Sequence, residues 1–129
     1  MNKIKLIIKN DMYPFKFYIF INYIDKDEIK KLVKYKKGYE VHKQTIEEQI
    51  NGANLTTCTA ITFYHETILG VILPPTKDKI ERFDSLNHEL FHLVSKAGKT
   101  IGLVQSEDSE EFYAYLQGWL TKKIYPKIC

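Results

Sequence analysis

The distribution of apolar and polar residues at the start of the chain predicts two β-strands. Residues 3–9 (KIKLIIK) begin with alternating lysine and isoleucine, which is typical of a strand with one buried face. Asn10-Asp11 and Pro14 are turn residues, and residues 15–24 (FKFYIFINYI) are rich in aromatic and β-branched side chains. We therefore expect these two segments to pair as antiparallel strands.

The apolar spacing then becomes helical. Asp25 and Glu28 form a capping-box pattern at the start of a helix that Gly38 is expected to end. In the middle of the chain, residues 45–50 (TIEEQI) predict a short helix. Residues 55–64 (LTTCTAITFY, which includes Cys58) and 68–73 (ILGVIL) predict two strands, joined by a turn at His65-Glu66-Thr67. Pro74-Pro75 is expected to end the last of these strands.

Two helices are predicted in the C-terminal third. The first begins at Asp78 or Asp84 and has an apolar stripe that reaches Gly98. Residues 99–105 predict a loop or a short strand, and residues 106–109 (SEDS) cap a last helix over 110–124 that ends near Pro126. This order predicts an α+β fold in which a small mixed or antiparallel sheet packs against two C-terminal helices. The 129 residues are expected to form a single domain.

Composition and charge narrow the possible functions. The net charge of +3 comes almost entirely from scattered lysines, with Arg82 the sole arginine, so we expect no nucleic-acid partner. Two cysteines do not make a disulfide framework. The start MNKIKLIIKND has charges too early for a secretory signal, and the most apolar stretch, 13–24, is too short to span a bilayer. We therefore expect a cytoplasmic protein that does not bind membranes.

Inside the first C-terminal helix, His88, Glu89 and His92 read H-E-x-x-H. Histidines four residues apart project from the same helix face, so both imidazoles can bind one metal ion. Glu89 is rotated by about 100° from His88, which places it beside the metal as a base and not as a ligand. The pattern predicts a catalytic zinc site, although two histidines and a carboxylate also suit iron and other divalent ions.

A catalytic zinc needs a third protein ligand. His42 and His65 precede the motif helix, and four acidic residues follow it, at Glu107, Asp108, Glu110 and Glu111. Ala114 and Gly118 are small residues that would let the last helix approach the motif helix closely. Glu111 lies roughly 40° from their mean direction and Glu110 roughly 60° on the other side. This favours Glu111 modestly and leaves Glu110 as the alternative.

His88-Glu89-x-x-His92 followed by Glu111-Phe112-Tyr113-Ala114 resembles the gluzincin arrangement of metallopeptidases. It is similar to short zincin-like proteins, including those of phages and mobile elements, and more distantly to ImmA/IrrE-type peptidases. The similarity covers roughly residues 80–124 and implies a minimal zincin-like fold, Glu111 as the third zinc ligand and Glu89 as the catalytic base. The chain departs from the family at Tyr115, where many such peptidases have Asn or Asp, and it lacks the metzincin extension.

The expected function is therefore zinc-dependent hydrolysis of a peptide or protein substrate, with Glu89 accepting a proton from the zinc-bound water. Tyr113, Tyr115 and His65 are candidates to stabilise the oxyanion. The strand pair over 55–73 has an edge that could bind an extended peptide. The alternative is a zinc-stabilised interaction module with little or no turnover, such as an inhibitor or regulator from a phage or mobile element that binds a host protein.

Overall fold

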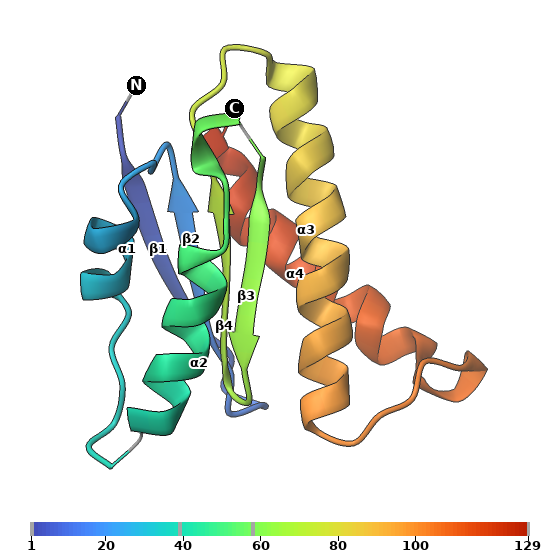
Figure 1. Cartoon of the computed structure of the whole chain (residues 1–129). Helices are drawn as coiled ribbons and strands as arrows, with labels where there is room; N and C mark the ends of the chain where they lie inside the picture. The colour runs from blue at the N-terminus through green and yellow to red at the C-terminus, as the bar shows by residue number, and fades with distance from the viewer. Residues whose placement is uncertain (1, 39, 58, 129) are drawn as a thin grey trace.

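The structure is a computed structural model that describes residues 2–38, 40–57 and 59–128. Figure 1 shows a central sheet with a layer of helices on each face. The strands are β1 (Ile4–Lys9), β2 (Lys16–Ile21), β3 (Ile61–His65) and β4 (Ile68–Leu73), in the order β1-β2-β4-β3. The helices are α1 (Lys26–Leu32), α2 (Glu40–Asn51), α3 (Lys79–Thr100) and α4 (Glu110–Ile128), with short 3-10 turns η1 (Leu55–Thr57) and η2 (Glu107–Ser109). The predicted α+β class, with a small sheet and two C-terminal helices, is confirmed.

The sheet is mixed. β1 pairs with β2 antiparallel, as the sequence predicts, and β3 pairs with β4 antiparallel through a two-residue turn. The two central strands, β2 and β4, pair in parallel. Because both faces of a central strand are covered by helices, β2 and β4 are almost continuously buried, whereas β1 alternates between exposed positions and positions that are partly or fully buried. β3 pairs only with β4, so it forms one edge of the sheet.

Each face of the sheet has its own hydrophobic core. On one face, α3 and α4 pack against inward-facing residues of β2 and β4 such as Ile19 and Val71. On the other face, α1 and α2 cover Tyr18, Phe20 and Phe63. Side chains of successive residues in a strand point to opposite faces. In β3, Phe63 therefore faces α2, and Thr62 and Tyr64 face α3.

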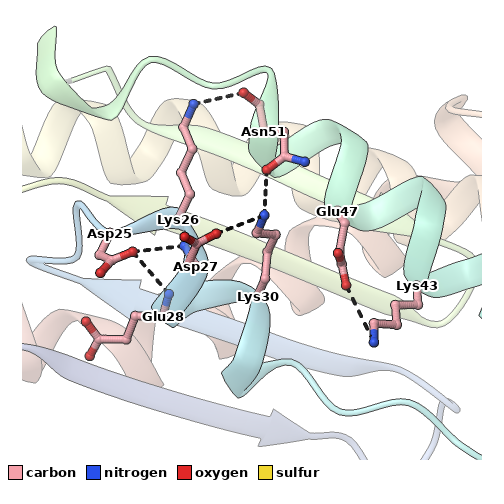
Figure 2. Close-up of polar contacts among 8 residues, drawn as sticks. All are labelled: Asp25, Lys26, Asp27, Glu28, Lys30, Lys43, Glu47 and Asn51. Atoms are coloured by element: carbon pink, nitrogen blue, oxygen red, sulfur yellow. Dashed lines mark hydrogen bonds and ion pairs between the residues drawn. The ribbon is translucent and has the colours of Figure 1, made fainter.

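Figure 2 shows how α1 and α2 are joined by polar contacts at the end of α2. Lys26 Nζ donates to the Asn51 carbonyl and Lys30 Nζ to Asn51 Oδ1, both at 2.8 Å. Cations at a helix C-terminus stabilise its unpaired carbonyls. Asp25 caps α1 as predicted, accepting from the backbone N–H groups of Asp27 and Glu28 at 2.9 and 3.2 Å. Glu28 is predicted to complete the capping box with Asp25, but its carboxylate accepts a 2.7 Å hydrogen bond from Lys3 Nζ.

Several predicted boundaries are wrong. α1 ends at Leu32, well before Gly38, and α2 begins at Glu40, earlier than the predicted helix. Of the predicted strand 55–64 only residues 61–64 are β-structure, and β3 continues one residue further to His65. The first part differs because Leu55 is buried against the α2 layer within a 3-10 turn. Cys58, predicted to lie in this strand, falls outside the described residues.

The C-terminal helices are longer than predicted. α3 is capped by Asp78 and continues through Gly98 to Thr100. α4 continues past Pro126 to Ile128. A proline in the last turn removes one backbone hydrogen bond, and packing there offsets this loss: Ile128 contacts the core, and the Tyr125 ring lies 5.4 Å from the Phe83 ring on α3. Among the described helices, none has the length and the apolar content needed to cross a bilayer.

Candidate metal centre

The H-E-x-x-H motif lies in the middle of α3, and its two histidines share an exposed face of the helix. The Nε2 atoms of His88 and His92 are 3.1 Å apart, and their rings meet edge to face with centroids 4.8 Å apart. Both side chains are exposed. The buried stripe of α3, centred on Leu86, Leu90 and Leu93, lies on roughly the opposite side of the helix. As the i and i+4 spacing predicts, the two imidazoles point to one place.

Glu89 is buried, with 8% of its surface exposed, and lies on the side of α3 that faces the edge strand β3. The Thr62 hydroxyl, on β3, donates to Glu89 Oε2 at 2.6 Å and lies 3.1 Å from the Glu89 carbonyl oxygen. A hydrogen bond from a side chain on a rigid strand restricts a carboxylate to one orientation. Glu89 thus occupies a defined position beside the histidine pair and against the edge of the sheet.

The outer edge of β3 is partly occupied by a side chain from α2. Gln49 Nε2 donates to the Tyr64 carbonyl at 2.9 Å, and the Tyr64 N–H donates to Gln49 Oε1 at 2.8 Å. The Gln49 amide thus pairs with Tyr64 as a neighbouring strand would. In an antiparallel pair, alternate residues direct their backbone groups outward. Thr62, two residues before Tyr64, therefore directs its own N–H and C=O outward, next to Glu89.

The packing of α4 corrects one step of the sequence reasoning. Its buried face is formed by Leu116, Leu120 and Ile124. Ala114 and Gly118, predicted to lie against the motif helix, are exposed, and a Cβ added at Gly118 would meet no described atom within 4 Å. The helices instead meet where a Cβ added at Gly98 of α3 would overlap the ring and hydroxyl of Tyr113. The close approach uses a small residue of α3 and a large one of α4.

This packing places Glu111 on the solvent side of α4. At about 100° per residue, Glu111 lies about 180° from Leu120 and about 160° from Tyr113. Glu110 lies about 60° from Tyr113 and thus on the flank of α4 that meets α3. Both glutamates are exposed. Of the two acids that the sequence left open, Glu110 is the one on the side of the motif helix.

The loop between α3 and α4 folds back over the histidine face. Gln105 Nε2 donates to Ser95 Oγ at 3.2 Å, and Ser95 lies one turn beyond His92 on the same face of α3. Residues 107–111 follow directly. Within the described part of the chain, however, no third His, Cys, Asp or Glu offers a ligand atom within 4.8 Å of both His88 and His92. Neither Glu111 nor Glu110 completes the three-residue site in this conformation.

The three oxyanion candidates have different surroundings. Tyr113 packs over Gly98, six residues beyond His92, and Tyr115 is half-exposed on the outer side of α4. His65 follows the alternation of β3 and faces α2, where its Nδ1 lies 2.6 Å from Nδ1 of His42. His65 is therefore on the face of the sheet opposite α3 and does not belong to the H-E-x-x-H site.

The contact between His42 and His65 brings together a second group of metal-ligand residues, which the sequence reasoning missed. Together with Glu66 they form the only group of three metal-ligand residues within 4.8 Å of one another among the residues described. No short motif links residues 23 positions apart, so the only signal was that His65 and Glu66 share a turn.

Comparisons of the chain with protein-family models, with curated proteins and with solved structures gave no match. The function is therefore inferred from the geometry of these side chains.

Proposed function

We propose that the protein is a zinc-dependent peptidase of the H-E-x-x-H type, with its zinc held by His88 and His92 and with Glu89 as the proton acceptor. The observation that carries the proposal is the arrangement on α3: two exposed imidazoles directed at one point, beside a buried carboxylate held by Thr62 of the edge strand. A cytoplasmic location belongs to the same proposal and rests on the cysteine usage.

The two histidines fit the proposed ion. Nitrogens bound tetrahedrally to one zinc lie about 3.3 Å apart, because Zn–N distances are about 2.0–2.1 Å. The Nε2 atoms of His88 and His92, at 3.1 Å, need to separate by only a few tenths of an ångström to reach this spacing. Both side chains are exposed, so an ion and a substrate can reach them.

For the third ligand we propose Glu110 in place of Glu111. Glu110 lies on the flank of α4 that meets α3, whereas Glu111 projects away from it. The contact of Gln105 with Ser95 holds the loop that leads to the acidic segment against the histidine face of α3. Completing the donor set requires Glu110 to move towards the histidines, and its exposed side chain leaves room for this movement.

Zinc would supply Lewis-acid activation of water and of the peptide carbonyl. The remaining chemistry belongs to the side chains. Thr62 holds Oε2 of Glu89, so Oε1 is the oxygen available to accept a proton from the attacking water and to return it to the leaving amine. The burial of Glu89 excludes bulk water from the carboxylate and strengthens its electrostatic interactions with the reacting groups.

The edge strand β3 supports a peptide substrate in extended conformation. A peptide can add to the edge through the outward N–H and C=O of Thr62, the residue whose hydroxyl also contacts Glu89. Gln49 already pairs with Tyr64, so the available edge lies on the Ala60 side of Tyr64. Backbone pairing at Thr62 would bring a substrate carbonyl close to the base.

The test is the zinc content of the untagged protein, measured by plasma mass spectrometry, beside cleavage of an unfolded protein substrate. We expect His88→Ala to hold one zinc per chain fewer than the natural protein and to lose activity, and Glu89→Gln to keep the natural zinc content and lose activity. Glu110→Ala should reduce zinc occupancy and Glu111→Ala should leave it unchanged, which makes the two a matched pair. Activity that survives in Glu89→Gln would contradict the peptidase proposal.

A second function is favoured by the absence of a third ligand within reach of His88 and His92 in the described structure. In this alternative the protein is an interaction module with little turnover that binds a host protein. The alternative predicts that Glu89→Gln leaves the biological effect intact, whereas the peptidase proposal predicts that the effect is lost.

A further inference from the structure

A second cluster of metal-ligand side chains lies on the other face of the sheet. His42 is in the first part of α2, His65 is the last residue of β3, and Glu66 is in the turn that leads to β4. The Nδ1 atoms of His42 and His65 are 2.6 Å apart, and His42 Nδ1 lies 3.7 Å from Glu66 Oε2. One ligand atom from each of the three residues lies within 4.8 Å of the other two.

The backbone at Glu66 is a separate indication. Glu66 has a φ of 52°, a left-handed conformation that glycine or asparagine normally occupies in a two-residue turn. A glutamate in this conformation costs roughly 1 kcal/mol relative to glycine. The conformation places a carboxylate next to two imidazoles. A side chain that serves as a ligand offers a reason for a residue that the turn itself disfavours.

We propose that His42, His65 and Glu66 form a second zinc site, which fastens α2 to the β3–β4 hairpin. Two imidazole nitrogens and one carboxylate oxygen are a donor set that zinc binds tetrahedrally, with the fourth position left to water. The side chains of His42 and Glu66 are 16% and 63% exposed, so the site is largely buried at His42 and open to solvent at the carboxylate.

The alternative is a hydrogen bond between the two histidines and nothing more. Such a bond needs one Nδ1 protonated and the other bearing its lone pair. Without a metal the Glu66 carboxylate has at most an ion pair with a protonated His42, at 3.7 Å, and this exposed contact is a weaker reason for the strained turn than a ligand role. With zinc bound, both Nδ1 atoms would be deprotonated and would lie about 3.3 Å apart, and the carboxylate would be the third ligand.

A zinc ion at this site would restrain the edge strand β3 by linking it to α2. His42 contacts the end of β3, and Gln49, two turns further along α2, already holds the backbone of Tyr64 in β3. Zinc would therefore add a second attachment between α2 and β3, beside the contact of Gln49 with Tyr64. Because this cluster does not use His88 or His92, the inference does not depend on the proposed peptidase function.

The experiment uses a double variant, His88→Ala with His92→Ala, to remove the motif histidines. Both are exposed, so we expect the fold to tolerate the change. Zinc is titrated against a chromophoric chelator, thermal unfolding is followed with and without zinc, and cobalt absorption reports the coordination. We expect one zinc per chain, a zinc-dependent rise in Tm, and a tetrahedral cobalt spectrum.

Further changes in this background locate the site. His42→Ala should abolish zinc binding, and Glu66→Gln should weaken it by at least roughly tenfold. Glu47→Gln, an acid on α2 outside the cluster, is the matched control and should have no effect. Glu66→Gly should raise Tm without zinc, because glycine relieves the backbone, and should still weaken zinc binding.

If the double variant binds no zinc, the proposal is overturned. It is equally overturned if Glu66→Gln, or a folded His42→Ala protein, binds zinc as tightly as the double variant itself. Glu66 is in an exposed turn, so we expect Glu66→Gln to keep the fold, and this variant decides the question even if His42→Ala unfolds.

Discussion

The hydroxyl of Thr62 donates a hydrogen bond of 2.6 Å to Oε2 of Glu89. This contact joins the edge strand of the sheet to the central glutamate of the H-E-x-x-H helix. Thr62 also directs its backbone to the outer edge of β3, so a peptide that pairs with this strand would meet the residue that orients the base. The orientation of Glu89 and the proposed docking of substrate thus depend on one residue.

Replacing Thr62 by Val should destabilise the fold by about 1–3 kcal/mol, because Glu89 is left buried without its donor. The free energy of unfolding can be measured by urea denaturation. Thr62→Ser keeps the hydroxyl and is the control, which should lose much less. If both variants lose the same stability, the hydroxyl of Thr62 contributes no more to stability than its methyl group does.

The contact between the C-terminal helices predicts opposite effects for two glycines. Gly98→Ala should destabilise by about 1–3 kcal/mol, because the added methyl group overlaps Tyr113. Gly118→Ala meets no described atom and should stabilise by about 0.5–1 kcal/mol through helix propensity. Thermal unfolding of both variants checks this. A stable Gly98→Ala protein would mean that α3 and α4 do not meet at this point.

Tyr35 predicts a stabilising substitution. Its hydroxyl is buried, makes no hydrogen bond to any described residue, and has its pKa raised by burial first and by Glu47 and Tyr18 second. Tyr35→Phe removes an unsatisfied polar group and should stabilise by about 1 kcal/mol in denaturant unfolding at neutral pH. A loss of stability would show that the hydroxyl has a partner in solution.

The same tyrosine predicts a pH dependence. The folded state holds Tyr35 protonated above the ordinary tyrosine pKa of about 10, while the unfolded chain releases the proton there. The unfolded state then binds fewer protons, so stability falls as pH rises from about 10 towards the raised pKa of the folded state. Tyr35→Phe should lose less stability over this window than the natural chain does.

The pairing of Gln49 with Tyr64 predicts a local change at the edge of the sheet. Gln49→Ala removes the acceptor of the Tyr64 N–H, so the amide of Tyr64 should exchange faster with solvent. Gln49→Glu keeps that acceptor and should retain the protection, although it loses the donor to the Tyr64 carbonyl. Amide hydrogen exchange followed by NMR measures both. Unchanged exchange in Gln49→Ala would mean that the contact is not populated.

Local patterns predicted the features that depend on neighbours in the sequence. The antiparallel pair β1 and β2, the β3–β4 hairpin and the caps Asp25 and Asp78 follow from alternation, turn residues and capping chemistry. The i and i+4 spacing of His88 and His92 is enough to place both imidazoles on one face, because the helix geometry is fixed.

Patterns failed where packing decided. Ala114 and Gly118 suggested a close helix contact, but the apolar residues Leu116, Leu120 and Ile124 turned the opposite side of α4 inward. Burial of large apolar side chains contributes more free energy than a short helix–helix distance. The geometric preference for Glu111 over Glu110 rested on that contact and changes with it, so only the resemblance to gluzincins still favours Glu111.

The sequence by itself determined the α+β class, the motif helix and the pair of histidines at one point, since each depends on short-range periodicity. Only the tertiary structure decided that Glu89 lies against Thr62, that Glu111 faces away from α3, and that His42 meets His65. Contacts between residues far apart in the chain depend on how sheet faces and helix faces are covered. That covering minimises exposed apolar surface over the whole molecule, and no local pattern encodes it.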